Sequence, residues 1–202
     1  MPRGIPISER MRQRNRHRIF KIAAQLFLEQ GYHETSMRQV AEAAGMGKST
    51  LYDYFPSKEE LLLYFVEQEM DNTYQDALRI ANTDRPATEK LRAILLAFWN
   101  YLNANLKTAV LTARESARLS EEATQRLVTK HAKYRKILEN VIRQGIQEGS
   151  FRLMDEALAA SALHSMMTRP FYDLRKQEAM GEVGATAEAL ADLFLRGIQA
   201  PP

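Results

Sequence analysis

Few residues of this sequence have the spacing of a catalytic or metal-binding site. The four histidines are His17, His33, His131 and His164. They show no metal-ligand spacing, so we expect core or surface roles for them. Gly47-Lys48-Ser49 ends like a phosphate-binding loop, but Glu42 stands where that loop requires glycine. The absence of cysteine excludes disulfides, thiol catalysis and zinc–thiolate sites. We therefore predict no enzyme, no metal and no cofactor.

The side chains best placed for recognition lie on a short predicted helix at about residues 48–54. Leu51 and Phe55 are four residues apart and share one face, which we expect to pack on the core. The residues left on the outward side are Ser49, Thr50, Tyr52 and Asp53. Such short polar and aromatic side chains reach base edges and thymine methyl groups in a DNA major groove. The alternative is an ordinary helical hairpin with a solvated face.

The elements around this helix complete a helix-turn-helix unit. A short helix at about residues 37–44 precedes it, and Gly45-Met46-Gly47 separates the two. Ser36 and Gln39 have the spacing of a capping box at the start of the first helix. Pro56 ends the second helix, because the residue before a proline avoids helical geometry. Two short helices joined by a glycine-containing turn are a common DNA-docking device.

The charge distribution also favours a polyanionic partner. The net charge is +3, and all of the excess lies within residues 1–60, while residues 61–202 are balanced. A dense basic segment contributes Arg10, Arg12, Arg14, Arg16, Arg18 and Lys21. Lys48 and Lys58 are placed to neutralise phosphates, and Thr35 and Ser36 offer hydroxyl groups nearby. Nucleic acid fits this basic end, although a solvated helix start is the plainer interpretation.

The whole chain reads as helix, so the predicted fold class is all-α. The first helix runs from about Ser8 to Gln30 and stops at Gly31. Further helices are expected at about 57–81, 88–105, 107–118, 121–148, 155–178 and 185–199. Pro170 is expected to kink or split the helix that contains it. We predict a DNA-binding domain at 1–56 and an effector-binding and dimerisation domain at 57–202. No apolar run is long enough to span a bilayer and no signal peptide is evident, so we expect a cytoplasmic protein without a membrane partner.

A multi-part match in the first third of the chain resembles a known family. The matching pieces are Ile19…Ala23-Ala24…Leu26-Phe27, Gly31-Tyr32, Thr35-Ser36-Met37, Val40-Ala41…Ala44-Gly45, Lys48…Thr50-Leu51-Tyr52…Tyr54-Phe55 and Ser57-Lys58-Glu59-Glu60-Leu61. Together they look like the DNA-binding domain of the TetR family of bacterial regulators. The remaining helices fit the family's variable body in number and length only.

The resemblance implies a homodimer that places one helix of each subunit in a major groove of a palindromic operator. By position it assigns DNA contacts to Thr35, Ser36, Gly47, Lys48, Ser49, Thr50, Tyr52, Tyr54 and Lys58. Two residues depart from the family pattern: Gly47 stands where serine is frequent, and Asp53 where histidine is common. A carboxylate facing phosphates is repelled unless it accepts from a cytosine amino group. Asp53 therefore either reads cytosine or is held off the DNA by a basic neighbour, and we favour the second.

The body contains adaptable and aromatic side chains that suit a small apolar effector. The predicted pocket residues are Phe98, Trp99, Tyr101, Arg114, Tyr134, Met166, Met167 and Arg169. For each residue taken singly, a place in the core or in a dimer interface is the better explanation, and the two arginines could as easily lie at the surface. The last two helices, at about 155–178 and 185–199, are the predicted dimer interface by family analogy. A faint similarity of the segment at Arg114-Glu115-Ser116 to fatty-acid-responsive family members suggests an acyl-type effector.

The sequence thus predicts a ligand-responsive repressor that an effector releases from its operator. The alternatives are an activator or ligand-independent DNA-binding protein, and, from another class, a helical protein-interaction module.

Overall fold

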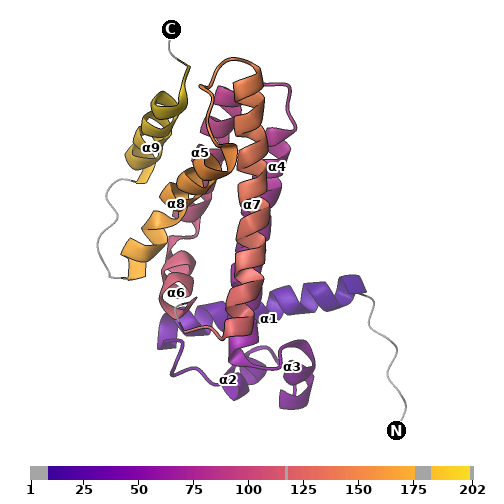
Figure 1. The fold of residues 1–202 in the computed structure, drawn as a ribbon. Coiled ribbons are helices and arrows are strands. Elements are labelled where there is room, and N and C mark those ends of the chain that lie inside the picture. Colours follow the sequence, from indigo (N-terminus) through magenta and orange to yellow (C-terminus); the bar gives the residue numbers. More distant parts are fainter. Residues whose placement is uncertain (1–8, 117, 176–182, 201–202) are drawn as a thin grey trace. The chain divides into compact units, whose positions relative to one another are not determined.

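The computed structural model describes residues 9–116, 118–175 and 183–200, and within residues 169–186 it describes no side chains. Every element named in these residues is a helix (Figure 1). The helices are α1 (Glu9–Gln30), α2 (Met37–Ala43), α3 (Lys48–Tyr54), α4 (Lys58–Ala81), α5 (Ala87–Ala104), α6 (Leu106–Ser116), α7 (Glu121–Gln147), α8 (Glu156–Arg175) and α9 (Val183–Ile198). The predicted all-α class is confirmed.

The chain forms two compact units, a head (Met1–Val66) and a body (Glu67–Pro202). The division falls inside α4, later than the predicted boundary after Pro56. Part of the reason is that the first turns of α4 pack in the head, where the ring of Phe65 stacks on Phe20 with centroids 4.5 Å apart. A periodicity that continues through one long helix gives no signal for this boundary.

Local capping explains the short helices of the head. The Ser36 hydroxyl accepts from the backbone of Gln39, and the Gln39 side chain accepts from the backbone N–H of Ser36 at 2.8 Å. This is the predicted capping box. At the end of α1, Gly31 has a φ of +97°, and its N–H donates to the carbonyl of Phe27 at 3.1 Å. Glycine adopts this left-handed geometry without the steric cost of a Cβ.

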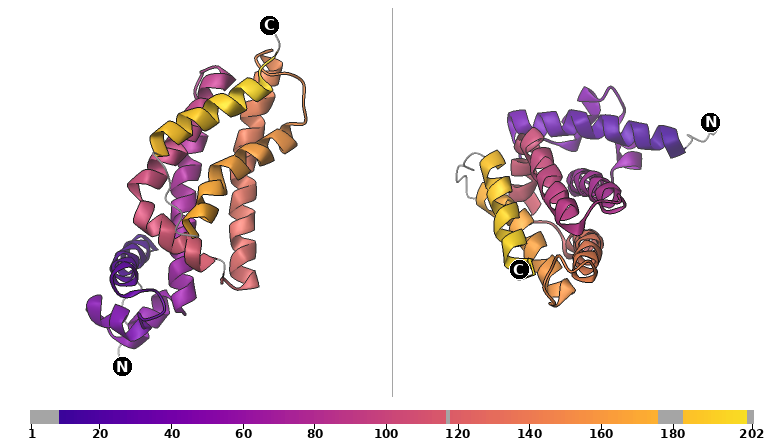
Figure 2. Two further views of the ribbon diagram at one scale, coloured as in Figure 1. Left: turned by 90° about the vertical axis from the view of Figure 1, so that its left-hand side faces the viewer. Right: turned by 90° about the horizontal axis from the view of Figure 1, so that it is seen from above.

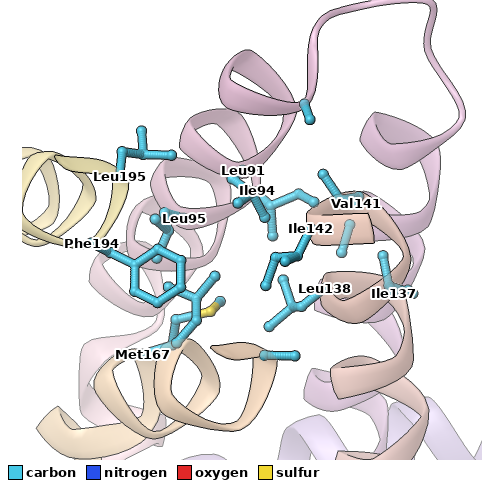
Figure 3. Close-up of a cluster of buried hydrophobic side chains, with 14 of the residues drawn as sticks. Leu91, Ile94, Leu95, Ile137, Leu138, Val141, Ile142, Met167, Phe194 and Leu195 are labelled. Atoms are coloured by element: carbon cyan, nitrogen blue, oxygen red, sulfur yellow. The ribbon is translucent and has the colours of Figure 1, made fainter. Parts of the chain in front are cut away.

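The body encloses the larger apolar core. In the right-hand view of Figure 2, α5, α7, α8 and α9 surround a common centre. Figure 3 shows the side chains that meet there: Leu91, Ile94, Leu95, Ile137, Leu138, Val141, Ile142, Met167, Phe194 and Leu195. On α5 and α7 they recur at three- and four-residue spacings, which is the stripe expected of a helix with one buried face.

Polar contacts fix the body helices around this core. The Arg126 guanidinium donates to both carboxylate oxygens of Glu67, at 3.0 and 2.8 Å, and Lys130 pairs with Asp71. These two pairs join α7 to the body part of α4. At the other end, the N–H of Arg152 donates to the carbonyl of Ile198 at 2.9 Å, which ties the α7–α8 loop to the end of α9.

Of the two outcomes predicted for Pro170, a split of its helix is wrong, because α8 runs from Glu156 to Arg175 without a break. A proline removes only one backbone donor, and packing of the remaining turns sustains a helix across such a loss. The other predicted helices agree with the observed ones to within a few residues at each end.

Candidate nucleic-acid interface

The helix α3 is anchored as the sequence predicts. Leu51 and Phe55 are both 0% exposed, and the helix covers Lys48–Tyr54. On its outward side, the exposed residues are Ser49, Thr50, Tyr52 and Asp53. Tyr52 is 39% exposed, an unusual state for so large a ring. The outward side of α3 therefore presents hydrogen-bonding side chains that a partner can reach.

Two predicted contact residues are used inside the head instead. Tyr54 is 8% exposed, and its hydroxyl accepts a hydrogen bond from the Asn15 amide at 2.8 Å. Thr35 is 1% exposed, and its hydroxyl donates to the carbonyl of Gly31 at 2.8 Å. Their side chains support the scaffold, so we leave them out of the proposed contact set.

Lys58 has a structural role as well. Its Nζ donates to the backbone carbonyls of Tyr32, Thr35 and His33, at 2.7, 3.1 and 3.3 Å. It also lies 4.4 Å from the centre of the Tyr32 ring. The ammonium group therefore ties the start of α4 to the loop between α1 and α2. Because its ammonium group is engaged in this way, we leave Lys58 out of the proposed set of DNA contacts.

The remaining predicted contacts form one exposed group, which we call the α3 patch: Gly47, Lys48, Ser49, Thr50 and Tyr52. The Lys48 Nζ lies 5.7 Å from the centre of the Tyr52 ring. A Cβ added at Gly47 would meet nothing closer than 3.9 Å, so this glycine leaves space for a phosphate to approach the helix start. Ser36 is also exposed, but its hydroxyl is engaged in the α2 capping box.

The arginines of α1 divide into two groups that sequence reasoning did not separate. Arg12 donates to the backbone carbonyl of Asp53 at 2.9 Å, and the Arg16 guanidinium lies between the rings of Phe55 and Tyr64, 4.9 and 4.6 Å from their centres. These two arginines brace α3 and α4. The exposed group on α1 consists of Arg10, Arg14, Arg18 and Lys21. Their spacing places them on one helix face.

The carboxylate of Asp53 is not held by a basic neighbour among the described residues. Arg12 donates to the backbone carbonyl of Asp53 and not to its side chain. The sequence favoured a basic partner that shields the Asp53 carboxylate, and the described residues contain no such partner. The charge of Asp53 lies exposed beside the α3 patch.

Replacing Asp53 by asparagine is expected to tighten binding to random-sequence duplex DNA. Removing one negative charge near phosphates is worth about 1 kcal/mol, or roughly fivefold in affinity. Fluorescence anisotropy titrations at two salt concentrations measure this. Glu29→Gln, which removes the same charge from an exposed position on α1, is the control and leaves affinity nearly unchanged. A large loss confined to one operator base pair would show instead that Asp53 reads cytosine.

The structure places the predicted effector residues in the two core clusters of the body and at its surface. Tyr134 and Met167 belong to the main body core, whereas Trp99 packs in a second cluster with Leu102 and Ala109. Arg114 is exposed on α6. Phe98 and Met166 are half-buried beside the main core, and the side chain of Arg169 lies outside the described residues.

The body holds two polar sites, one buried at Trp99 and one half-buried at Tyr101. The indole nitrogen of Trp99 has no hydrogen-bond partner among the described residues. Tyr101 accepts from the Asn72 amide at 3.2 Å and hydrogen-bonds Glu69, and burial raises the pKa of both Tyr101 and Glu69. An unsatisfied buried donor is costly, so it favours a polar ligand group or a water molecule at Trp99.

Among the described residues, one open groove is polar and lies between α5 and α9. It is lined by Thr88, Glu89, Arg92, Asp192, Leu195, Arg196 and Gln199. None of the predicted effector residues lines it. Arg92 crosses it and pairs with Glu188 at 2.6 Å and with Asp192.

Sequence reasoning also missed the contact between two histidines. His131 on α7 and His164 on α8 meet with Nδ1 and Nε2 3.1 Å apart. They are 33 residues apart on different helices, so no spacing rule could find them. Only the apolar stripes that pack α7 on α8 signal that the two helices are neighbours.

No helix in the described part of the chain is both long enough and apolar enough to cross a membrane.

Comparison with known proteins agrees with this geometry. Residues 19–65 match the family of bacterial regulatory proteins, tetR family, and residues 84–198 match the Tetracyclin repressor-like C-terminal domain. The chain is 23% identical to the fatty acid metabolism regulator protein of Bacillus subtilis over 181 residues, 89% of this chain and 93% of that protein. It is 27% identical to the HTH-type transcriptional repressor KstR2 of Mycolicibacterium smegmatis over 138 residues, 68% of this chain and 67% of that protein.

A solved structure shares the fold. The transcriptional regulator FadR from Bacillus subtilis, crystallised in complex with stearoyl-CoA, superposes with a TM-score of 0.77 at 22% identity, covering 91% of this chain and 99% of that one. The family matches cover both the head with its exposed α3 and most of the body. The chain therefore belongs to the TetR family of bacterial regulatory proteins and is a DNA-binding, ligand-responsive transcriptional regulator.

Proposed function

We propose that this regulator is a homodimeric repressor that binds a palindromic operator in the cytoplasm and leaves it when an apolar, acyl-type effector binds the body. The observation that carries the proposal is the orientation of α3. Buried Leu51 and Phe55 hold the helix, and the α3 patch is left exposed. A helix so presented fits a major groove, and two copies on a dimer read half-sites about 34–36 Å apart.

The dimer proposal rests on exposed leucines of the last two helices. Leu158 on α8 is 70% exposed and Leu193 on α9 is 65% exposed, while Leu163 and Phe194 on the same helices are buried in the subunit's own core. The apolar side chains of these two helices thus divide into an inward and an outward set. Large exposed apolar side chains on neighbouring elements are typical of interfaces. A two-helix surface from each subunit suits a four-helix contact.

The effector class is proposed from the relatives and from the body's composition. One relative is named for fatty acid metabolism, and a protein of the same fold was crystallised with stearoyl-CoA. In this chain, half-buried Phe98 and Met166 border the core, and the Trp99 indole nitrogen lacks a described partner. Apolar walls with a few polar groups suit an amphipathic acyl compound.

Selection of bound duplexes from a random library tests the DNA part of the proposal. We expect an inverted repeat to be enriched, because a symmetric dimer reads two equal half-sites. Tyr52→Ala should abolish or alter the enriched sequence, whereas Leu28→Ala, an exposed leucine on α1, should not. Enrichment of no sequence would favour a protein-interaction module instead.

The same preparation tests symmetry and induction. Leu193→Glu should give a monomer in analytical ultracentrifugation and lose operator affinity, while Leu153→Glu, in the α7–α8 loop and 87% exposed, should remain dimeric. An acyl compound, tested both as the free fatty acid and as stearoyl-CoA, should release the DNA from the operator complex. If no acyl compound at saturation changes operator affinity, the induction part fails and a ligand-independent regulator is the better description.

A further inference from the structure

The pair formed by His131 and His164 lies half-buried between α7 and α8. Its ring centroids are 4.9 Å apart and its nearest nitrogens 3.1 Å apart. Two neutral imidazoles at this distance share one N–H···N hydrogen bond, so one ring donates and the other accepts. One additional proton binds the nitrogen of the donor ring that points away from its partner, so that ring becomes an imidazolium and still donates to the neutral ring. The pair can therefore take up one positive charge and keep its hydrogen bond.

Two aromatic rings lie directly beside the histidine pair. The Tyr134 ring lies 5.9 Å from His164 and 6.5 Å from Phe98, centre to centre. Tyr134 is 6% exposed, and no hydrogen bond of its hydroxyl group is found among the described residues. Phe98 is half-buried against both core clusters of the body. The histidine pair thus stands at the polar edge of an aromatic wall.

The charges around the pair are positive and uncompensated. Arg135, one turn along α7 from His131, is half-buried, and no ion pair of its guanidinium is found in the described part of the chain. Burial and the charge of Arg135 lower the pKa of His131. Burial, the facing His131 and Arg135 together lower the pKa of His164 to about 4. On the neighbouring α4, the charge of Asp76 acts on Tyr134.

We propose that His131, His164 and Arg135 form a binding site for the carboxylate of an apolar acid, and that the acid binds together with one proton. The apolar chain of the ligand would lie along Tyr134 and Phe98. As a claim about the effector, this rests on the function proposed above, and it adds the chemistry of the effector's polar end.

The preference for a carboxylate follows from the lack of an acidic partner for Arg135 among the described residues. A carboxylate between the imidazoles and Arg135 supplies a negative charge that favours the protonated pair. It accepts hydrogen bonds from an imidazolium and from the guanidinium, and such charge-assisted bonds are the strong ones. Because the complex holds one more proton than the free protein, affinity must rise as pH falls. A neutral ligand of the same chain length has no such dependence.

The direct test is calorimetry of the full chain, without DNA, with decanoate and with decanol. Decanoate is expected to bind at least about tenfold more tightly at pH 6 than at pH 8, since one proton is taken up. The uptake is read from the dependence of the binding heat on the ionisation enthalpy of the buffer. Decanol should show neither effect. Equal binding of the two probes, or decanoate binding without proton uptake, overturns the proposal.

Substitutions locate the site. Arg135→Gln should weaken decanoate binding about tenfold, the size expected for one lost charge-assisted hydrogen bond. Lys133→Gln removes the same charge from an exposed position on the same helix and is the matched control. His164→Gln should abolish the pH dependence, with folding checked by circular dichroism. Unchanged decanoate binding in folded Arg135→Gln, or stabilisation by Zn²⁺ in place of decanoate, overturns the site.

These outcomes are separable from those of the proposed function. The calorimetry involves no DNA, so it reports on the site alone. If decanoate binds with proton uptake but operator affinity does not change, the site stands and the effector role fails. Operator release without decanoate binding at this pair leaves the repressor assignment intact and overturns the site.

Discussion

Leu51→Ala is expected to lower the free energy of unfolding of the head by about 3 kcal/mol, the typical cost of a cavity left by a buried leucine. Leu51 is 0% exposed and lies at the centre of a helix of seven residues. A helix this short has no stability of its own and depends on its packing. Operator binding should therefore weaken at least about tenfold, because α3 no longer holds its orientation.

Hydrogen exchange of the head amides, measured beside operator titrations, checks this result. Thr50→Ala, at the neighbouring exposed position, is the matched control: it should weaken operator binding while leaving exchange protection unchanged. The two variants thus separate loss of the scaffold from loss of a contact. Undiminished protection in Leu51→Ala would mean that α3 is not anchored through this residue.

Gly145→Ala is expected to destabilise the body by about 3 kcal/mol, at the upper end for overpacking a core. A Cβ at Gly145 would lie 2.1 and 2.2 Å from two ring carbons of Phe151. That ring cannot easily move away, because Phe151 is 2% exposed and its N–H donates to the Gly145 carbonyl at 3.0 Å. The clash outweighs the gain of about 1 kcal/mol that alanine normally brings inside a helix.

Gly197 supplies the comparison for this prediction. It also lies in a helix, α9, but a Cβ there would meet nothing within 4 Å. Gly197→Ala should therefore raise the melting temperature, while Gly145→Ala lowers it. Adding Phe151→Leu to Gly145→Ala should restore part of the loss. A Gly145→Ala variant as stable as the parent would show that the loop after α7 can yield.

Local sequence signals predicted the helices whose first and last residues are marked by glycine, proline or capping residues. The bounds of α3 follow from Gly47 before it and Pro56 after it, and α2 begins at the capping box of Ser36 and Gln39. These signals act over a few residues, so a single sequence displays them completely. The inward direction of Leu51 followed from helix periodicity alone.

Partners distant in the sequence could not be predicted in this way. Thr35 and Lys58 look like surface polar residues in the sequence, yet the structure uses them as internal hydrogen-bond donors. Arg12 reaches Asp53 across 41 positions. Such pairings depend on how helices pack, and helical periodicity does not specify the neighbour of each face.

The effector residues show the same limit in the body. Aromatic and methionine side chains are candidates for a pocket, and Met167 and Tyr134 lie in the main body core. An apolar stripe has the same composition whether it faces another helix or a ligand. The pairing of His131 with His164 became visible only once α7 and α8 were packed together.

The placement of Trp99 has a practical consequence for optical measurements. It is the chain's single tryptophan, and it is 2% exposed among the side chains of α5 and α6. Intrinsic tryptophan emission thus monitors the body alone, and the head contributes nothing to that signal. Melting followed by emission and melting followed by far-ultraviolet ellipticity should coincide only if both units lose their structure in one cooperative step.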